Sequence, residues 1–262
     1  MNAALSADNP VTIEREDPIA VVTLNRPAVR NAFNAQMRSA FAEAVRSVND
    51  DPGIRFAVLR GAGAGFSAGA DLPEEFAGSI SAQIENEYKP FLTGIAEAET
   101  IWIASVHGAA AGIGGALAMA CDLNVMADDA SIYLAFAAIG LIPDGGATWQ
   151  LLNAMGYRRA LETVIEGKRI PAADCLAYGL ANKVVPADRV HDEALAWARS
   201  LSAGAPLAQA AAKRVLRHIG RMRLQDAITL EARKQQGLVE SQDFRDAVAA
   251  FFARRKPEFH GR

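Results

Sequence analysis

Two stretches rich in glycine and alanine carry backbone groups that could do chemistry in this 262-residue chain. They span residues 61–71 and 108–115, and each follows an apolar run with strand character. Small residues let the backbone itself approach a ligand, and two N–H groups that meet at one point form an oxyanion hole. Tight packing of helix on strand explains either stretch singly. Together they predict main-chain stabilisation of a negatively charged oxygen.

An acidic loop, Pro143-Asp144-Gly145-Gly146, supplies a carboxylate. A free aspartate titrates near about 3.9, and an apolar pocket raises that pKa toward the range in which a carboxylate takes up and returns protons. Pro-Asp-Gly is also an ordinary turn in which the aspartate binds its own backbone. The loop alone leaves both interpretations open.

Serine hydrolysis is one alternative, because residues 65–69 read Gly-Phe-Ser-Ala-Gly and match the G-x-S-x-G nucleophile elbow. His191, His218 and His260 lie downstream of Ser67, so the order of a catalytic triad is possible. An elbow places its serine directly between a strand and a helix, whereas five small residues intervene here after Arg60. Labelling of Ser67 by a fluorophosphonate would support this alternative.

Nicotinamide-dependent oxidoreduction is a second alternative, because residues 108–114 have the G-x-x-x-G-x-G spacing of a phosphate-binding turn. That turn belongs at the first strand of its fold, yet 107 residues precede this one. Dehydrogenases with this turn carry a Tyr with a Lys four residues later. The residues four positions after the four tyrosines are Leu92, Ala137, Leu161 and Asn182.

Two further polar residues near these stretches have structural interpretations. Asp71 is expected to act as a helix N-cap or turn former, and His107 as a satisfied core histidine. Cys121 and Cys175 each lie in an apolar stretch, which favours small buried residues in a reducing interior over a disulfide or metal cluster. The net charge of −3 provides no strong global field for nucleic acid or an anionic membrane.

The elements that position these residues alternate between strand and helix. A helix capped by Asn34 is expected to run to about Val48, and another from about Ser81 to Ala98. Strands are predicted over residues 11–15, 19–24, 55–59, 101–106 and 122–126. A short helix is predicted over residues 116–120. After residue 146 everything to Phe252 is expected to be helical except residues 181–185. This pattern predicts an α/β fold, with a core over residues 1–200 and a helical region over 201–262 in one folding unit.

A membrane span over residues 101–121 is disfavoured, because the stretch contains Ser105, His107 and four glycines and is flanked by acids. A buried strand followed by a buried helix is expected instead. The first ten residues lack the charged start and apolar centre of a secretory signal, so a cytoplasmic location is expected.

The motifs together resemble the enoyl-CoA hydratase/isomerase family, also called the crotonase family. The resemblance rests on six segments in the family's order: residues 24–27 with 31–32, 66–72, 108–115 with 120–123, 139–146, 177–180 with 184–186, and 251–257. It implies a spiral of ββα units with a helical C-terminal trimerisation region. It also implies an acyl-CoA thioester substrate, no metal or redox cofactor, and a homotrimer or a hexamer built as a dimer of trimers.

Carried over by position, the oxyanion donors are the N–H groups of Ala70 and Ile113. Hydratases of the family use two glutamates to activate water, and the matching positions here are Ala116 and Phe136, which cannot transfer a proton. Asp144 matches the carboxylate that similar isomerases use as a single proton shuttle. The resemblance therefore implies an isomerase that shifts a double bond or rearranges an epoxidised ring in a CoA thioester.

The same resemblance identifies five residues as contacts for substrate or CoA: Arg26, Arg30, Ala68, Leu72 and Lys256. It also makes residues 75–92, which include Tyr88 and Phe91, a wall of the acyl pocket. A hydratase or hydrolase that uses a different carboxylate, and a non-catalytic acyl-CoA binder, remain as alternative functions.

Overall fold

Two β-sheets form the framework of the protein. The computed structural model describes residues 9–72, 74, 78–220 and 222–262; the first eight residues of the segment analysed for a secretory signal and residues 75–77 of the expected pocket wall lie outside them. The larger sheet contains β1 (Val11–Glu16), β2 (Ile19–Leu24), β3 (Phe56–Gly61), β4 (Ile101–Val106), β6 (Leu123–Ala127) and β9 (Lys183–Val185), in that spatial order. β1 is antiparallel to β2, and the following pairs are parallel. The smaller sheet contains β5 (Ala109–Ala111), β7 (Ser131–Tyr133) and β8 (Arg169–Pro171).

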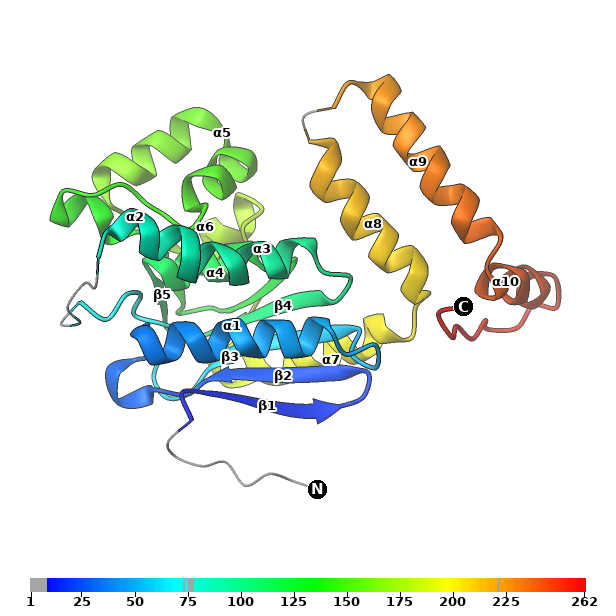
Figure 1. Ribbon diagram of the computed structural model, residues 1–262, viewed down its shortest axis with the longest axis horizontal. Helices are drawn as coiled ribbons and strands as arrows, with labels where there is room; N and C mark the ends of the chain where they lie inside the picture. Colours follow the sequence, from blue (N-terminus) through cyan, green and yellow to red (C-terminus); the bar gives the residue numbers. More distant parts are fainter. Residues whose placement is uncertain (1–8, 73, 75–77, 221) are drawn as a thin grey trace.

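Helices connect and cover these strands (Figure 1). The α-helices of the core are α1 (Ala35–Asn49), α2 (Ile80–Gln83), α3 (Lys89–Glu97), α4 (Ile113–Ala120), α5 (Ala147–Glu166), α6 (Ala172–Ala177) and α7 (Val190–Ser202). Short 3-10 turns are η1 (Pro27–Val29), η3 (Ala135–Ile139) and η4 (Ala187–Arg189). The central strands β3 and β4 are buried almost throughout, as expected for parallel strands covered on both faces. The predicted α/β class is confirmed.

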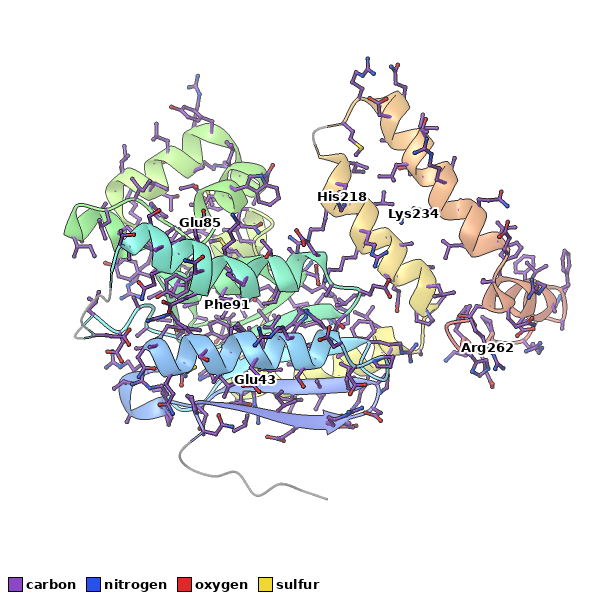
Figure 2. All side chains as sticks on the ribbon, viewed as in Figure 1. Glu43, Glu85, Phe91, His218, Lys234 and Arg262 are labelled. Atoms are coloured by element: carbon purple, nitrogen blue, oxygen red, sulfur yellow. The ribbon has the colours of Figure 1, made fainter. Side chains whose placement is uncertain are left out.

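The helix predicted to start after Asn34 is confirmed, because the Asn34 side chain accepts a hydrogen bond from the Met37 N–H at 2.9 Å. α1 packs against α3, and Phe33, Phe41 and Phe91 form an aromatic cluster there with ring centroids 5.0 to 6.1 Å apart. Figure 2 shows Phe91 pointing from α3 into this layer. The cluster fixes α3 on the core, and α3 forms one side of the site described below.

The single helix predicted over residues 81–98 is interrupted by a π-helical turn, η2 (Ile84–Tyr88), between α2 and α3. The Lys89 N–H bonds to the Ile84 carbonyl, five residues back. Pro90 follows directly and has no N–H with which to continue an α-helical pattern. π-turns of this kind change which side chains face the core.

Two sequence expectations about short strands are wrong. The second glycine stretch was expected to be a loop, but it contains β5; the region after residue 146 was expected to hold one strand, but it also contains β8. Three-residue strands carry too little alternation to be recognised, and their partner β7 lies far along the chain from β8.

The buried strand and helix predicted for residues 101–121 are present as β4 and α4. Among the described residues, no helix combines the length and apolarity that crossing a bilayer requires.

Three helices complete the chain: α8 (Pro206–Ile219), α9 (Leu224–Val239) and α10 (Gln242–Phe252). α8 is tied to the core by buried Lys213, whose ammonium lies 2.8 Å from Asp122 and also donates to two backbone carbonyls. α9 and α10 lie away from the sheets (Figure 1) and expose large apolar side chains, including those of Leu224, Phe251 and Phe252. The helical C-terminal region that was predicted is therefore present and leaves an apolar surface uncovered in a single chain.

Candidate active site

Asn31 organises the first glycine stretch. It is fully buried, and its side-chain amide donates to the carbonyls of Ala62, Gly65 and Phe66 at 2.9 to 3.1 Å. Its own carbonyl accepts a hydrogen bond from the Ser67 hydroxyl at 2.9 Å. These bonds hold residues 61–67 in one conformation, which fixes the direction of the chain toward Ala70.

The two glycine stretches run side by side. Ser67 forms a parallel bridge with Ala110, and Ala70 and Ile113 each lie three residues beyond a member of this bridge. A Cβ atom on Gly69 would lie 2.9 Å from the Ala111 carbonyl oxygen and 3.5 Å from the Gly112 Cα. Only glycine fits this close approach, and Gly69 also has a φ of +96°. The close approach of Gly69 to Ala111 and Gly112 brings the segment that leads to Ala70 beside the segment that leads to Ile113.

The N–H groups of Ala70 and Ile113 are available to a ligand. Among the described residues, neither group donates to a backbone carbonyl. Ile113 is the first residue of α4, where the helix dipole adds positive potential. Each amide is therefore free to donate to a ligand oxygen, as an oxyanion hole requires, and the assignment of this pair stays a prediction.

Asp144 lies on the loop that packs against the start of α4. A Cβ atom added to Gly145 would lie 2.6 Å from Ile113 Cδ1, 3.0 Å from Ala116 Cβ and 3.4 Å from Leu92 Cδ1. Asp144 Oδ1 is buried and has no hydrogen-bond partner among the described residues. Burial raises the pKa of Asp144 above its ordinary value of 3.8. The structure thus brings Ile113 and the Asp144 loop into direct contact and gives the carboxylate an apolar setting.

Apolar side chains stand at the two positions where hydratases of the family carry glutamates. Ala116 is fully buried on α4, and Phe136 lies on η3, where its Cζ would be 3.9 Å from a Gly112 Cβ. Both positions therefore border the site. Neither side chain can bind or activate a water molecule.

Ser67 is not placed as a nucleophile. It is 1% exposed, its hydroxyl donates to the Asn31 carbonyl, and it accepts from the Gly69 N–H at 3.2 Å. The nucleophile-elbow alternative is therefore wrong, because a serine hydrolase needs an accessible hydroxyl beside a base. His107 is only partly satisfied: Nε2 donates to the Gly63 carbonyl at 2.8 Å, while buried Nδ1 has no partner among the described residues.

The candidate CoA contacts separate into groups. Arg30 and Ala68 lie together, since the Ala68 N–H donates to the Arg30 carbonyl at 2.8 Å and both line a cavity of about 310 Å³ beside the glycine stretches. Arg26 is engaged elsewhere: it forms an ion pair with Asp71 at 2.9 Å and donates to the Ala32 carbonyl. The Asp71 side chain is thus an ion-pair partner and not the helix N-cap that was expected, while its backbone carbonyl accepts from the Glu74 N–H at 3.0 Å in a turn.

The remaining predicted contacts, Leu72 and Lys256, do not join this cavity. Leu72 is 68% exposed on the loop after Ala70. Lys256 lies beside the end of α7, in a separate cavity with Ser202 and Ala203. Within one chain the structure therefore groups Arg30 with Ala68 and leaves Lys256 apart from them.

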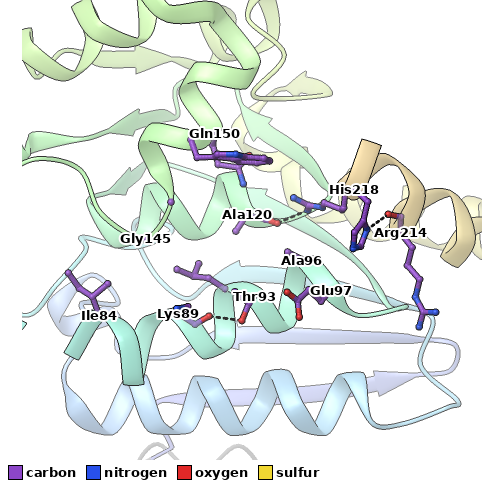
Figure 3. A pocket seen from close by; sticks show the side chains of 14 residues that line it. Ile84, Lys89, Thr93, Ala96, Glu97, Ala120, Gly145, Gln150, Arg214 and His218 are labelled. Carbon is purple, nitrogen blue, oxygen red and sulfur yellow. Dashed lines mark hydrogen bonds between the residues drawn. The ribbon is translucent and has the colours of Figure 1, made fainter. Parts of the chain in front are cut away.

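A further cavity of about 430 Å³ adjoins the Asp144 loop. It lies between α3, the start of α5 and α8, and its lining includes Leu92, Thr93, Ala96, Gly145 and Trp149 (Figure 3). Leu92 and Gly145 border both this cavity and the Ile113 side of the site. The cavity is therefore placed to receive the part of a ligand that extends beyond the carboxylate.

The sequence missed one residue of the site and did not orient another. Arg169 on β8 lies over the Tyr133 ring at 4.1 Å and lines the cavity that contains Arg30. The strand that carries it was not predicted, so no pattern connected it with residues 30 and 68. Tyr88 was placed on the pocket wall without an orientation, and the structure buries it to 2% exposure.

Comparison with known proteins identifies the family of this chain. A family model described as enoyl-CoA hydratase/isomerase matches residues 14–262. The chain belongs to the enoyl-CoA hydratase/isomerase family. The resemblance drawn from the six segments is confirmed, and it supersedes the dehydrogenase alternative. As a member of the enoyl-CoA hydratase/isomerase family, this protein is an enzyme that acts on acyl-CoA thioesters.

Relatives in the enoyl-CoA hydratase/isomerase family include proteins named as hydratases and proteins named as isomerases. A probable enoyl-CoA hydratase of Rhodobacter capsulatus is 36% identical over 96% of this chain and 98% of its own length. The 1,2-epoxyphenylacetyl-CoA isomerase of Escherichia coli K12 is 33% identical over 94% and 97%. A solved structure described as subunit I of an enoyl-CoA hydratase, from Geobacillus kaustophilus, is 30% identical, covers 98% of this chain and 100% of its own, and has a TM-score of 0.92. The crotonase fold is thereby confirmed.

Proposed function

We propose that this enzyme is an acyl-CoA isomerase that moves a double bond, or rearranges an epoxidised ring, by proton transfer through Asp144. The observation that carries the proposal is the Asp144 carboxylate: its Oδ1 is buried and lacks a partner among the described residues, and the next residue, Gly145, packs against the first turn of α4. The relative named 1,2-epoxyphenylacetyl-CoA isomerase supports the same reaction type.

In the proposed mechanism, the thioester oxygen of a 3-enoyl-CoA accepts hydrogen bonds from the Ala70 and Ile113 N–H groups. The Asp144 carboxylate removes a proton from C2, and the C–H electron pair moves into the thioester, giving a dienolate whose charge lies on the oxygen. Asp144 then returns the proton to C4, which leaves the conjugated 2-enoyl-CoA. One donor of this kind contributes about 3 to 4 kcal/mol to barrier lowering in other enzymes.

This reaction is redox-neutral and begins and ends with the same carboxylate, so the proposed mechanism includes no cofactor. The CoA part of the substrate is assigned to the cavity beside the glycine stretches, where Arg30 and Arg169 supply positive charge for phosphates. Lys256 and Leu72 remain proposed contacts, Lys256 from a neighbouring subunit. The acyl part beyond C4 is assigned to the cavity between α3, α5 and α8.

Hydration is the second candidate, favoured by the name of the 36% identical relative. It would require a carboxylate other than residues 116 and 136, which are Ala and Phe here. The test is a panel of 3-enoyl, 2-enoyl and epoxidised phenylacetyl thioesters, with products identified by mass and absorbance. Isomerisation leaves the mass unchanged, whereas addition of water to crotonyl-CoA would establish the hydratase.

We further propose that the enzyme assembles as a homotrimer through the apolar side chains that α9 and α10 expose. Leu224, Phe251 and Phe252 are each more than three-quarters exposed in the single chain. Large exposed apolar side chains on unpartnered helices favour an interface between proteins. Sedimentation at micromolar concentration is expected to give the mass of three chains or of six, and a monomer would contradict the proposal.

A further inference from the structure

Tyr88 places a polar group deep in an apolar layer. It is 2% exposed and ends the π-helical turn Ile84–Tyr88, which directs its ring inward beside Phe91, with ring centroids 5.9 Å apart. Burial raises the pKa of Tyr88 to about 12, so the phenol is neutral and can act as a hydrogen-bond donor. Buried tyrosine hydroxyls normally have a partner.

A buried cation lies against this phenol. The Arg38 side chain from α1 is 5% exposed, its Cζ is 5.8 Å from the Tyr88 ring centroid, and it forms ion pairs with Glu74, at 2.6 Å, and Glu87. It also donates to the Phe33 carbonyl at 3.2 Å. Arg38 therefore connects three segments around Tyr88 and holds the π-helical turn in place.

The same contacts relate Tyr88 to the oxyanion side of the site. The Phe33 carbonyl that accepts from Arg38 also accepts from the Asp71 N–H, and Phe33 forms a bridge with Ala70. The side of the Tyr88 ring that Arg38 covers therefore lies toward the segment that contains Ala70.

The other neighbour of Tyr88 is the Asp144 loop. Tyr88 and Leu92 are four residues apart and lie on one face of the helix, about 6 Å apart along its axis. Leu92 Cδ1 is 3.4 Å from the point where a Gly145 Cβ would begin. The charge of Asp144 also contributes to the raised pKa of Tyr88, as expected for two groups that share one apolar region. Tyr88 thus lies between the two halves of the site.

We propose that Tyr88 is a positioning residue for Asp144: in the enzyme–substrate complex its hydroxyl, oriented by Arg38, donates a hydrogen bond to the Asp144 carboxylate and holds it toward the acyl group. This inference rests on the proposed function of Asp144. Asp144 Oδ1, buried and without a partner among the described residues, is the acceptor. A donor there offsets part of the cost of burying the ionised carboxylate.

Charged groups surround this pair on several elements, and the cavity beside the Asp144 loop is lined by Lys89, Glu97, Arg214, Arg217 and His218. Tyr88 faces Arg38 on α1, Glu74 on the loop after Ala70, and Glu87 on its own turn. α4 packs against the Asp144 loop and contains no titratable residue in its sequence. Lys89 on α3 is paired with Glu85 at 2.6 Å on the exposed side. Loss of the Tyr88 hydroxyl is therefore expected to act on Asp144 directly.

The test is a Tyr88→Phe variant, with Tyr157→Phe, an exposed tyrosine on α5, as the matched control. Infrared spectra of the complex with a saturated acyl-CoA are recorded against pH, and the band of protonated Asp144 is identified by its loss in Asp144→Asn. Removing a donor to a carboxylate raises the carboxyl pKa. The pH midpoint of the Asp144 band is therefore expected to rise by about one unit or more in Tyr88→Phe and to stay unchanged in Tyr157→Phe. The acid limb of kcat should move upward in parallel, with KM little changed.

An unchanged midpoint in a folded Tyr88→Phe enzyme would overturn the inference. If that variant does not fold, Arg38→Lys retains the positive charge but releases the phenol, and the midpoint must still rise. The failure of the proposed function is a separate result: Asp144→Asn would then retain turnover, while the infrared midpoint still reports whether Tyr88 contacts Asp144.

Discussion

The two sides of the site differ in how their polar groups are satisfied. On the donor side, the Asn31 amide makes three hydrogen bonds and Ser67 both donates and accepts, so the segment that leads to Ala70 is rigid and complete. On the acid side, Asp144 Oδ1 is buried with no partner among the described residues. The donor side is thus built from backbone that the Asn31 and Ser67 side chains support, and the acid side from one carboxylate with an oxygen that lacks a partner among the described residues.

This difference separates binding of the thioester from the choice of reaction. Backbone donors are insensitive to the identity of the residues that carry them, so one oxyanion hole serves hydratases and isomerases alike. A lone carboxylate with a raised pKa decides where a proton goes. The destabilised group is therefore expected to carry the reaction, while the satisfied groups hold the substrate.

The largest effect is expected for Asp144→Asn, which removes the acid side and leaves the donor side intact. The variant is expected to lose about a thousandfold in kcat on a 3-enoyl-CoA, because it lacks the proposed proton shuttle. The Kd for acyl-CoA should change less than threefold. Asp174→Asn, an exposed aspartate on α6, is the control and should match the wild type. Full turnover in Asp144→Asn would show that the base has been wrongly assigned.

Gly69→Ala tests the donor side and is expected to lower kcat about a hundredfold. The new Cβ would lie 2.9 Å from the Ala111 carbonyl oxygen at a φ of +96°, so the backbone must shift and the Ala70 N–H moves with it. Gly179→Ala shares the positive φ, +78°, but meets open space among the described residues. Equal losses in both variants would point to backbone strain alone.

A smaller effect is expected when the cavity beside Asp144 is filled. Ala96→Phe places a ring in the space between α3, α5 and α8 and should reduce kcat/KM for long acyl chains about tenfold, since each methylene of buried contact contributes about 0.8 kcal/mol. Four-carbon substrates serve as the internal control and should be unaffected. A uniform loss across chain lengths would place the acyl tail elsewhere.

The smallest expected effect is on stability. The pKa of Asp144 is raised in the folded state above 3.8, so ionisation of this group destabilises the fold as pH rises through that range. Asp144→Asn avoids the penalty and should melt about 2 °C higher at pH 7, with the difference closing below pH 4. A difference that does not depend on pH would contradict this assignment. Asp174→Asn again provides the comparison in the melting curves.

Much of the fold could be predicted from local patterns. Asn34 as a cap, the apolar runs of β2 and β4, and the buried helix α4 each follow from residue type and spacing. The strands β5, β7 and β8 could not, because three residues carry no period and their pairing is set by contacts distant in sequence. The π-helical turn before α3 also depends on packing that no single segment reveals.

The site divides in the same way. The two glycine stretches that meet at the bridge of Ser67 with Ala110 could be identified from the sequence, and the family resemblance assigned Ala70 and Ile113 within them. The burial of Asp144, the ion pair that occupies Arg26, and the place of Arg169 depend on three-dimensional packing. The role inferred for Tyr88 depends on the inward direction of its side chain, which the sequence does not show.

The central claim is that Asp144 alone carries the proton between two carbons of an enolate held by the Ala70 and Ile113 amides. The most direct measurement is turnover of 3-hexenoyl-CoA in heavy water, with deuterium located at C2 and C4 of the product by mass and nuclear magnetic resonance. The account predicts a 2-enoyl product of unchanged composition that partly retains its own proton at C4, and no transfer in Asp144→Asn while acyl-CoA still binds. A product that carries added water, or proton transfer at the wild-type rate in Asp144→Asn, would contradict it.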